Sequence, residues 1–408
     1  MNRTAISLAM ASVLVVAACT DDDSAGDGTG STGVAVSASS PVDDGAVEAT
    51  PATDPSSAGL GGDSVITDRS SLEPTTGSTD DITTSSGVDE SGATLDPVPF
   101  SDLEVVTFEV PDGSRPHDVA PALDGGVWYT AQRSGELGYL DPESGATRHI
   151  PLGPGSSPHG VIVGPDGLAW VTDSGLNAIV SVDPATDEVT TYPLPPDAPD
   201  ANLNTAAFDG AGRLWFIGQN GIYGVLDVAS GTIEAYPAPR GRGPYGITAT
   251  PEGQIYFASL AGSYIGLIGD DGSVAEIDPP TPAQGARRVW SDSTGAIWVS
   301  EWNSGQLSRF DPNTDQWLVW PLPGDDPAAY AVYVDGADQI WVSDFGGNAI
   351  HRFDPDTEAF ETFQLPAEPS EVRQLLGRGN EIWGAQSADD SLVVIRPASW
   401  SAAAGIAG

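Results

Sequence analysis

The sequence predicts an all-β fold, a seven-bladed β-propeller with four-stranded blades, and two observations carry this prediction. A segment with the same order of apolar runs and turns recurs along the C-terminal three quarters of the 408-residue chain. An aromatic residue recurs within it every 41 to 45 residues, a period typical of propeller blades. The aromatic positions are Trp128, Trp170, Trp215, Tyr256, Trp298, Trp341 and Trp383.

Each repeat contains four short apolar runs separated by Gly, Asp and Pro turns. In the second repeat we expect strands over 160–163, 169–172, 178–182 and 189–192. The aromatic residue falls on the second strand, where it is expected to fill the space between neighbouring sheets. Asp-Pro pairs are expected to turn the third strand into the fourth at Asp141, Asp183, Asp311 and Asp354.

The seventh repeat ends after three strands, near Pro397. Its missing outer strand is expected at the start of the domain, over about 103–110, because this run is similar to the fourth strands of the other repeats. Pairing the two would close the ring and remove two exposed sheet edges. We therefore predict a propeller over 100–398, followed by a short tail over 399–408.

Residues 1–18 are predicted to be a lipoprotein signal peptide. One Arg, an apolar stretch and small residues precede Cys19, the only cysteine in the chain. The apolar stretch is too short for an ordinary spanning helix. We expect cleavage before Cys19 and lipid attachment to it, which would anchor an exported protein to the outer face of a bacterial cell membrane. The alternative is an ordinary signal peptide that happens to end near a cysteine.

The segment over 19–99 is predicted to be a disordered tether. It is rich in Ser, Thr, Gly, Asp and Pro, and Arg69 is its only basic residue. Such a composition buries too little apolar surface to offset the entropy lost on ordering. A flexible linker of roughly 80 residues has a root-mean-square reach of about 50 Å. The tether could therefore hold the propeller away from the membrane.

Charge excludes several classes of function. The chain has 58 acidic residues against 15 basic residues, all of them Arg, and its formal net charge is -43. Without Lys, Schiff-base chemistry is excluded. Nucleic acids and anionic lipid surfaces are unfavourable partners because their phosphates would be repelled. We expect a monomer whose contact with the membrane is the lipid anchor.

One position in the repeat is expected to surround a mouth of the central channel. It lies eleven residues before the aromatic, at the start of the innermost strand, and carries a hydrogen-bonding side chain in every repeat. The ring positions are His117, His159, Asn204, Tyr245, Arg287, Tyr330 and, after a loop shorter by one residue, Arg373. The two remaining histidines of the chain, His149 and His351, are assigned to outer strands at the surface.

A second inward-facing set is expected three residues after each aromatic. Its carboxylates, Asp173, Glu301 and Asp344, could approach His117 and His159 and form a metal or proton-transfer site. The alternative is a wet channel whose polar groups bind ordered water. Trp302 and Phe345 are candidates for the apolar walls of a small-ligand site at the same mouth.

Four recurring motifs carry a family resemblance: Pro158-His159-Gly160, Gly243-Pro244-Tyr245-Gly246, Gly167-Leu168-Ala169-Trp170 and Tyr192-Pro193-Leu194-Pro195. With them, residues 103–397 resemble the streptogramin B lyase (virginiamycin B lyase) family. The resemblance implies a seven-bladed propeller. It also implies a Mg²⁺-assisted elimination that opens cyclic depsipeptide antibiotics at an ester.

The family's reaction depends on a His at the inner position of the sixth blade, a Glu-Pro-His that begins the seventh and a Glu after the seventh Trp. This chain has Tyr330, Glu371-Val372-Arg373 and Ser387 at those places. Glu371 is the one match, and thus the catalytic and metal candidate that the resemblance supplies. Arg373 stays protonated and cannot act as an ordinary base. Loss of the second carboxylate weakens a Mg²⁺ site, which prefers oxygen ligands.

The sequence therefore predicts an anchored propeller that binds a small molecule or peptide at its central funnel without the lyase mechanism. No cofactor is required, and Mg²⁺ is implied only by the resemblance. One alternative is a lyase or hydrolase that opens a cyclic depsipeptide or lactone with His117 or His159. Another is a protein–protein scaffold.

Overall fold

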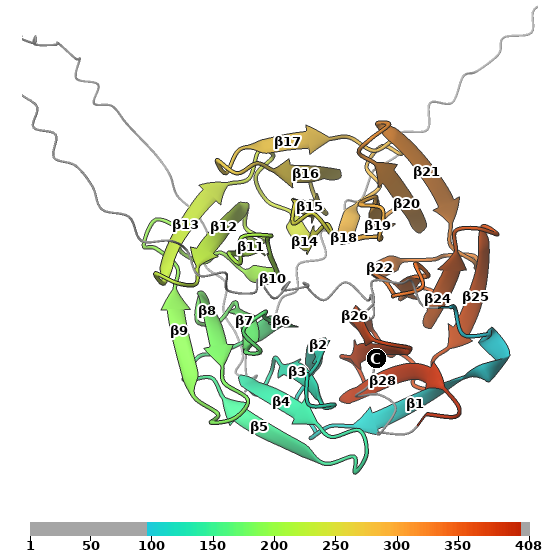
Figure 1. Ribbon diagram of the computed structural model, residues 1–408, viewed down its shortest axis with the longest axis horizontal. Helices are drawn as coiled ribbons and strands as arrows, with labels where there is room; N and C mark the ends of the chain where they lie inside the picture. The colour runs from blue at the N-terminus through green and yellow to red at the C-terminus, as the bar shows by residue number, and fades with distance from the viewer. Residues whose placement is uncertain (1–95, 401–408) are drawn as a thin grey trace, which may run out of the picture. The chain divides into compact units, whose positions relative to one another are not determined.

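Seven four-stranded antiparallel sheets surround a common axis in the computed structural model, which describes residues 96–400 (Figure 1). The sheets follow one another around the ring in chain order. One short 3-10 helix, η1 (Phe100–Asp102), precedes the first strand. The prediction of an all-β, seven-bladed propeller is confirmed.

Each blade runs outward from its innermost strand. The first three blades comprise β2 (Pro116–Pro121), β3 (Val127–Ala131), β4 (Glu136–Leu140) and β5 (Thr147–Pro151); β6 (Pro158–Val163), β7 (Ala169–Asp173), β8 (Ala178–Val182) and β9 (Val189–Pro193); and β10 (Leu203–Phe208), β11 (Leu214–Gly218), β12 (Ile222–Asp227) and β13 (Thr232–Pro237).

The next three blades comprise β14 (Pro244–Ala249), β15 (Ile255–Ser259), β16 (Tyr264–Ile268) and β17 (Val274–Ile277); β18 (Ala286–Ser291), β19 (Ile297–Glu301), β20 (Gln306–Asp311) and β21 (Gln316–Pro321); and β22 (Ala329–Val334), β23 (Ile340–Asp344), β24 (Ala349–Asp354) and β25 (Ala359–Gln364).

The seventh blade joins the two ends of the domain. Its inner strands are β26 (Val372–Arg378), β27 (Glu381–Gln386) and β28 (Ser391–Pro397), and its outer strand is β1 (Leu103–Glu109). β1 pairs antiparallel with β28 over its whole length, from Leu103 opposite Pro397 to Glu109 opposite Ser391. Figure 1 shows the cyan β1 beside the red β28. The predicted closure is confirmed.

The repeated aromatic residues form the core between the blades. Each lies on the second strand of its blade, and none is more than 2% exposed. Three of the indoles donate an N–H to an aspartate six residues earlier, in the preceding turn, which gives their one polar atom a partner inside an apolar interface. The Nε1–Oδ2 distances are 2.9 Å to Asp209, 2.9 Å to Asp292 and 2.7 Å to Asp335.

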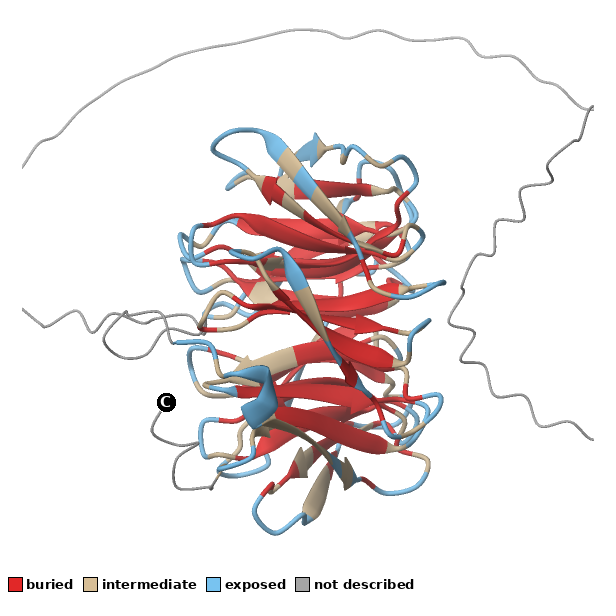
Figure 2. Ribbon diagram, turned by 90° about the vertical axis from the view of Figure 1, so that its right-hand side faces the viewer, coloured by how far each residue is buried: buried red, intermediate tan, exposed pale blue. Residues whose placement is uncertain are grey.

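Apolar side chains of neighbouring sheets pack against one another around these aromatics. Trp128 of the first blade, for example, belongs to one buried cluster with Val161 and Val171 of the second. Buried residues fill the inner and middle strands, whereas the outer strands and loops are more exposed (Figure 2). The described part of the chain contains no helix that is long and apolar enough to cross a membrane.

The predicted Asp-Pro turns also form. In each one the aspartate Oδ1 accepts the backbone N–H two residues later, at 2.8 to 2.9 Å, as in an Asx turn. These carboxylates stabilise the turns between the third and fourth strands, at the outer edge of each blade and away from the innermost strand. The predicted signal peptide, Cys19 and nearly all of the predicted tether lie outside the described residues.

Candidate functional site

A β-bulge positions each ring residue. In every blade the pairing between the first and second strands shifts, and the predicted ring residue lies within the shifted step. His159, for example, lies between Pro158, opposite Asp173, and Gly160, opposite Thr172. A bulge leaves its extra residue unpaired and redirects the side chain, and bulges are frequent beside active sites. The fold therefore presents seven side chains from equivalent bulges around the channel.

Hydroxyl groups on the second strands hold these bulges in place. Thr130 Oγ1 accepts the backbone N–H of Asp118 at 2.9 Å and donates to the carbonyl oxygen of His159, in the next blade, at 2.8 Å. Each hydroxyl thus supports its own bulge and ties it to the next. The same arrangement is formed by Thr172, Ser300 and Ser343.

The first two blades contribute a histidine pair. The His117 and His159 rings lie 3.7 Å apart between centroids, and neither residue is more than 2% exposed. His117 Nδ1 donates to Asp118 Oδ1 at 2.8 Å. Asp118 Oδ1 also accepts an N–H of Arg288, from the fifth blade, at 3.1 Å. The bond to Asp118 places the proton of a neutral His117 on Nδ1 and leaves Nε2 as an acceptor.

Burial sets the charge of these groups. It lowers the pKa of His117 well below its usual value, and the nearby charges of Arg373, Arg288, Arg115 and Arg287 lower it further. Burial, with the neighbouring His117, also lowers the pKa of His159. Burial raises the pKa of Asp118, and the Arg288 guanidinium opposes that rise. Both imidazoles are therefore neutral at pH 7.

Several buried polar atoms here have no hydrogen-bond partner among the described residues. Native structures leave few such atoms, so a group of them indicates a place where water, an ion or a ligand binds. The atoms are His117 Nε2, Asp118 Oδ2, both ring nitrogens of His159 and both amide atoms of Asn204.

The fourth to sixth blades contribute a cationic, aromatic part of the ring. Arg287 donates to Tyr245 Oη at 2.7 Å, and its guanidinium carbon lies 3.6 Å from the centre of the Tyr330 ring. The Tyr245 and Tyr330 hydroxyls lie 2.5 Å apart. Of the two predicted apolar walls, Phe345 stacks on Tyr330 at 4.5 Å and Trp302 meets Tyr330 edge-on at 5.7 Å. Desolvated cation–π contacts of this kind hold a guanidinium firmly.

The carboxylates of the second predicted set bond within their own blades. Asp173 accepts from Ser156 and from the backbone N–H of Ser157. Glu301 accepts from Ser304 and Ser308. Asp344 accepts from the backbone N–H groups of Ala328 and Gly346. The carboxylate that reaches His117 is instead Asp118.

Asp118 and Arg288 were missed by reasoning from the sequence, although a signal was present. They occupy the same place in their repeats, directly after the ring residue, and are the charged residues at that place. Opposite charges at equivalent inner positions of the first and fifth blades can meet across the channel, as they do here.

The assignment of His351 to the surface is wrong. His351 lies on β24, the third strand, and is 2% exposed. Its Nε2 lies 3.3 Å from Asp344 Oδ2 and its Nδ1 lies 3.0 Å from Thr362 Oγ1. The buried Asp344 carboxylate needs a partner, and His351 supplies one. His149 lies on the outermost strand β5, half-buried, between Tyr129 and Glu136.

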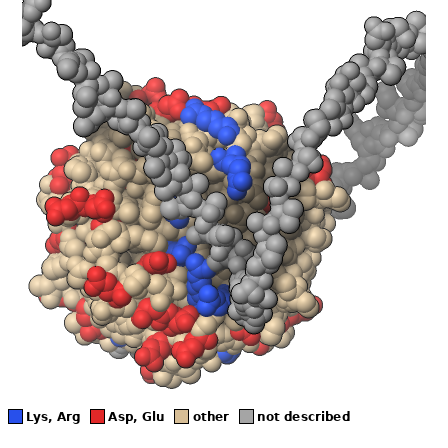
Figure 3. Space-filling view, turned by 180° about the vertical axis from the view of Figure 1, so that it is seen from behind, with Lys and Arg blue, Asp and Glu red and all other residues tan. Residues whose placement is uncertain are grey.

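Charge is unevenly distributed at the surface. On the face shown in Figure 3, basic side chains gather in a band that reaches the middle, while acidic ones are spread over the rest.

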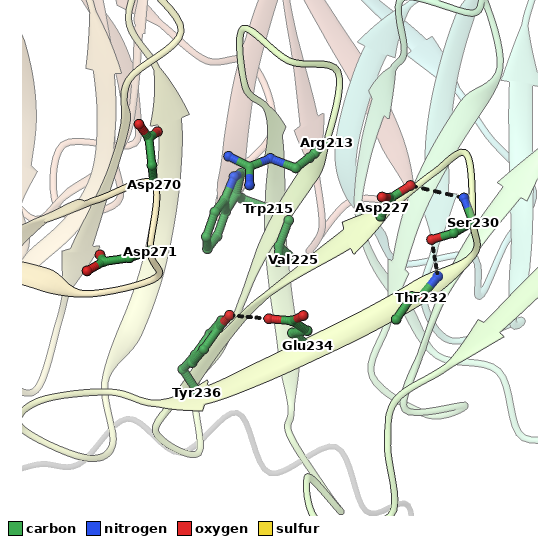
Figure 4. Close-up of a pocket in the computed structure, with 10 residues that line it drawn as sticks. All are labelled: Arg213, Trp215, Val225, Asp227, Ser230, Thr232, Glu234, Tyr236, Asp270 and Asp271. Carbon is green, nitrogen blue, oxygen red and sulfur yellow. Dashed lines mark hydrogen bonds between the residues drawn. The ribbon is translucent and has the colours of Figure 1, made fainter. Parts of the chain in front are cut away.

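An outer groove of 510 Å³ opens between the third and fourth blades (Figure 4). Several of its polar groups already have partners: Tyr236 donates to Glu234 at 2.5 Å, and Arg213 and Trp215 both donate to Asp209. The ring is the stronger candidate site, because His117, His159 and Asn204 have buried polar atoms with no partner within residues 96–400.

The residues at the positions where the resemblance implies Mg²⁺ ligands do not suit that ion. Glu371 Oε2 accepts an N–H of Arg373 at 2.9 Å, so its charge is already paired. Ser387, which stands where the family has its second carboxylate, donates its hydroxyl to the Pro116 carbonyl at 2.6 Å. Mg²⁺ sites in proteins are built on carboxylate oxygens and waters in an octahedral arrangement. Glu371, whose carboxylate is already paired, and Ser387, whose hydroxyl is already hydrogen-bonded, do not supply the oxygen ligands of such a site.

Comparison with known proteins supports the resemblance. The sequence model of the virginiamycin B lyase family matches residues 100–317, from η1 into β21, so the sixth blade and the three C-terminal strands of the seventh lie beyond the match. A streptogramin B lyase structure has a TM-score of 0.67 and 25% identity, and the match covers 73% of this chain and 98% of that one.

Virginiamycin B lyase from Staphylococcus aureus has a TM-score of 0.67 and 20% identity, covering 72% of this chain and 99% of that one. A catalytically inactive form of that enzyme with quinupristin matches equally well. No curated protein matches the sequence. The family match covers more than half of the chain, and the chain therefore belongs to the virginiamycin B lyase family.

Proposed function

We propose that the propeller binds a small molecule or peptide with an anionic group at the seven-residue ring, without the family's lyase mechanism. The observation that carries this proposal is the group of buried polar atoms on His117, His159 and Asn204 that have no partner in the described part of the chain. They supply hydrogen-bond donors and acceptors on rigid inner strands, as preorganised ligand sites do.

The charge of the surroundings selects the kind of ligand. Four arginines act electrostatically on His117, although the chain as a whole is strongly acidic. Among the described residues, Asp118 pairs with Arg288 and Glu371 pairs with Arg373. In a site of low dielectric, this gathering of guanidinium groups favours a carboxylate or phosphate. The aromatic surfaces of Trp302 and Phe345 favour an apolar portion beside it.

The geometry argues against the family's reaction. Tyr330 replaces the sixth-blade His, and its hydroxyl is within hydrogen-bond distance of Tyr245. Arg373 replaces the second His and pairs with Glu371. A tyrosine and an arginine are both poor proton acceptors at neutral pH. Mixing the full-length chain with quinupristin and Mg²⁺ should give no ring-opened product by mass spectrometry.

Calorimetry with short peptides tests the proposed binding. The probes are N-acetylated tripeptides with free C-terminal carboxylates, together with the same peptides as C-terminal amides, titrated in EDTA. We expect the acids to bind at least tenfold more tightly than the amides. Arg287→Gln should remove most of that preference. Arg148→Gln, which removes the same charge from the outer strand β5, should leave it unchanged.

Equal affinity for acids and amides would contradict the anionic preference. Binding that survives in an Arg287→Gln/His159→Ala double variant would place the site away from the ring.

A second candidate function follows from the bond between Asp118 and His117. It leaves Nε2 of a neutral imidazole as an acceptor, the state in which a histidine takes up a proton as a general base. A hydrolase or lyase acting on a cyclic ester would use that nitrogen. Ring opening of quinupristin that Tyr330→Phe retains and His117→Ala abolishes would favour this candidate over binding alone.

We further propose that Cys19 carries a lipid that anchors the chain to the outer face of the membrane. The support is the sequence pattern before Cys19. Expression in a bacterial host with labelled palmitate should give a labelled, membrane-associated protein. Cys19→Ser should abolish both label and membrane association. A labelled Cys19→Ser variant would contradict the proposal.

A further inference from the structure

The histidine pair and its aspartate form a compact group of metal-binding atoms. One donor atom from each of His117, Asp118 and His159 lies within 4.8 Å of the others. Ligands about 2.1 Å from one ion are at most about 4.2 Å apart, so small side-chain rotations would bring all three into range. All three residues are buried, and their backbones are fixed by bulges and by Thr130.

The atoms that remain available are those that a metal would use. His117 Nε2, Asp118 Oδ2 and both nitrogens of His159 have no partner among the described residues. Asp118 meanwhile accepts the Nδ1–H of His117. A carboxylate that accepts the far N–H of a ligating histidine is a recurrent outer-shell feature of metal sites, where it fixes the ring and its tautomer. Asp118 therefore acts here as a positioning residue, with Oδ2 as an additional donor.

The donor types select the ion. Two imidazole nitrogens suit Zn²⁺, Ni²⁺, Cu²⁺ or Co²⁺, whereas Mg²⁺ and Ca²⁺ prefer oxygen ligands. The nearby arginines reinforce this selection because Mg²⁺ sites depend on negative charge from the protein. An ion held mainly through neutral nitrogens beside arginines would complete its coordination with an anion from solution or from a bound ligand.

We propose that His117 and His159, oriented by Asp118, bind one first-row transition-metal dication, with Zn²⁺ as the representative ion. This site lies between the first two blades and uses neither Glu371 nor Ser387 of the seventh. The metal site and the proposed ligand site share His117 and His159, but they are tested separately. Metal binding is measured without peptide, and peptide binding is measured in EDTA.

Cobalt titration tests the proposal directly. Metal-free full-length chain is titrated with Co²⁺, and the visible ligand-field absorption reports coordination by nitrogen and oxygen atoms. We expect saturation at one equivalent, displacement by one equivalent of Zn²⁺ and no displacement by a tenfold excess of Mg²⁺. Absence of the absorption band, or displacement by Mg²⁺, would overturn the proposal.

Variants locate the ion. His117→Ala and His159→Ala should each weaken Co²⁺ binding by at least tenfold. Asp118→Asn should weaken it by about 10- to 100-fold while keeping the shape of the spectrum, because it removes a positioning bond. The matched control is His149→Ala, which removes a histidine from β5. Unchanged binding in a His117→Ala/His159→Ala double variant would overturn the assignment.

Thermal unfolding of the wild-type chain provides a readout that does not depend on the variants' folding. Zn²⁺ in excess over its dissociation constant should raise the midpoint, since it binds the folded site. The same concentration of Mg²⁺ should not. A midpoint that Zn²⁺ leaves unchanged would contradict a site on these buried strands.

Discussion

The second strands and the innermost strands of the same blades differ sharply in what varies from repeat to repeat. The second strand keeps a buried aromatic residue in all seven blades, and none exceeds 2% exposure. The bulged position eleven residues earlier carries His, Asn, Tyr or Arg, and is nearly as buried, at 0 to 6%. Burial in the first case is apolar packing, which every blade needs in the same way. Burial in the second brings polar groups around a channel, where each blade can contribute different chemistry.

The largest expected effect is on closure of the ring. Deleting residues 102–110 removes β1 and the whole β1–β28 ladder, leaving β28 as an open edge. We expect loss of cooperative thermal unfolding by circular dichroism. Deleting residues 80–88, an equally long piece of the predicted tether, is the control and should leave unfolding unchanged. Unchanged unfolding after deletion of β1 would show that the six complete blades hold the structure alone.

A large effect is also expected at the buried aromatic residue that recurs in every blade. Trp298→Ala removes a fully buried side chain and leaves Asp292 Oδ2 without its indole partner. The free energy of unfolding should fall by about 3 to 5 kcal/mol. Leu318→Ala, on the outer strand of the same blade and 50% exposed, should change it by less than about 0.5 kcal/mol. Denaturant titration measures both, and similar effects would contradict the assigned role of the aromatic core.

Glu301 and Asp344 provide a smaller, opposed pair of effects at equivalent positions, three residues after their tryptophans. Burial raises the pKa of Glu301 above 4.5, against hydrogen bonds from Ser308 and Ser304. Burial also acts to raise the pKa of Asp344, but hydrogen bonds from His351 and the backbone outweigh it, and the pKa falls below 3.8. The folded state therefore favours a protonated Glu301 and an ionised Asp344.

The pH dependence follows from these directions. The ionised Glu301 carries a stability penalty that develops as the pH rises above about 4.5, so Glu301→Gln should become relatively more stable over that range. Asp344 contributes stability that is present above pH 3.8 and is lost on acidification below it. Asp344→Asn should thus cost about 1 to 3 kcal/mol at pH 7, with the deficit shrinking below pH 3.8. Parallel pH profiles for the two variants would contradict the different environments.

The fold could be predicted because repetition multiplies weak signals. One Trp in one apolar run predicts little, but six Trp and one Tyr at nearly constant spacing define the blades. The short seventh repeat indicates where β1 must pair. The ring positions followed from the same alignment. The bulges that orient these side chains could not be predicted, because a shift in strand register does not change the pattern of apolar and polar residues.

The partners within the site were harder to predict than its positions. Asp118 and Arg288 are 170 residues apart in sequence, and only the closed ring brings them to 3.1 Å. His351 was misplaced for a related reason: its neighbours in sequence do not show that the Asp344 carboxylate is buried beside it. Contacts across the channel and between strands depend on how the blades are arranged in the folded ring. A single repeat does not contain that information.

A paired measurement on His159→Ala tests the central claim most directly, namely that the blades carry stability and the ring carries binding. The thermal midpoint should stay within about 4 °C of wild type, because His159 belongs to none of the hydrophobic clusters between blades and its two ring nitrogens have no partner among the described residues. Affinity for the tightest-binding acetylated tripeptide acid, measured in EDTA by calorimetry, should fall at least tenfold. A stable variant that binds the peptide as tightly as wild type would contradict the account.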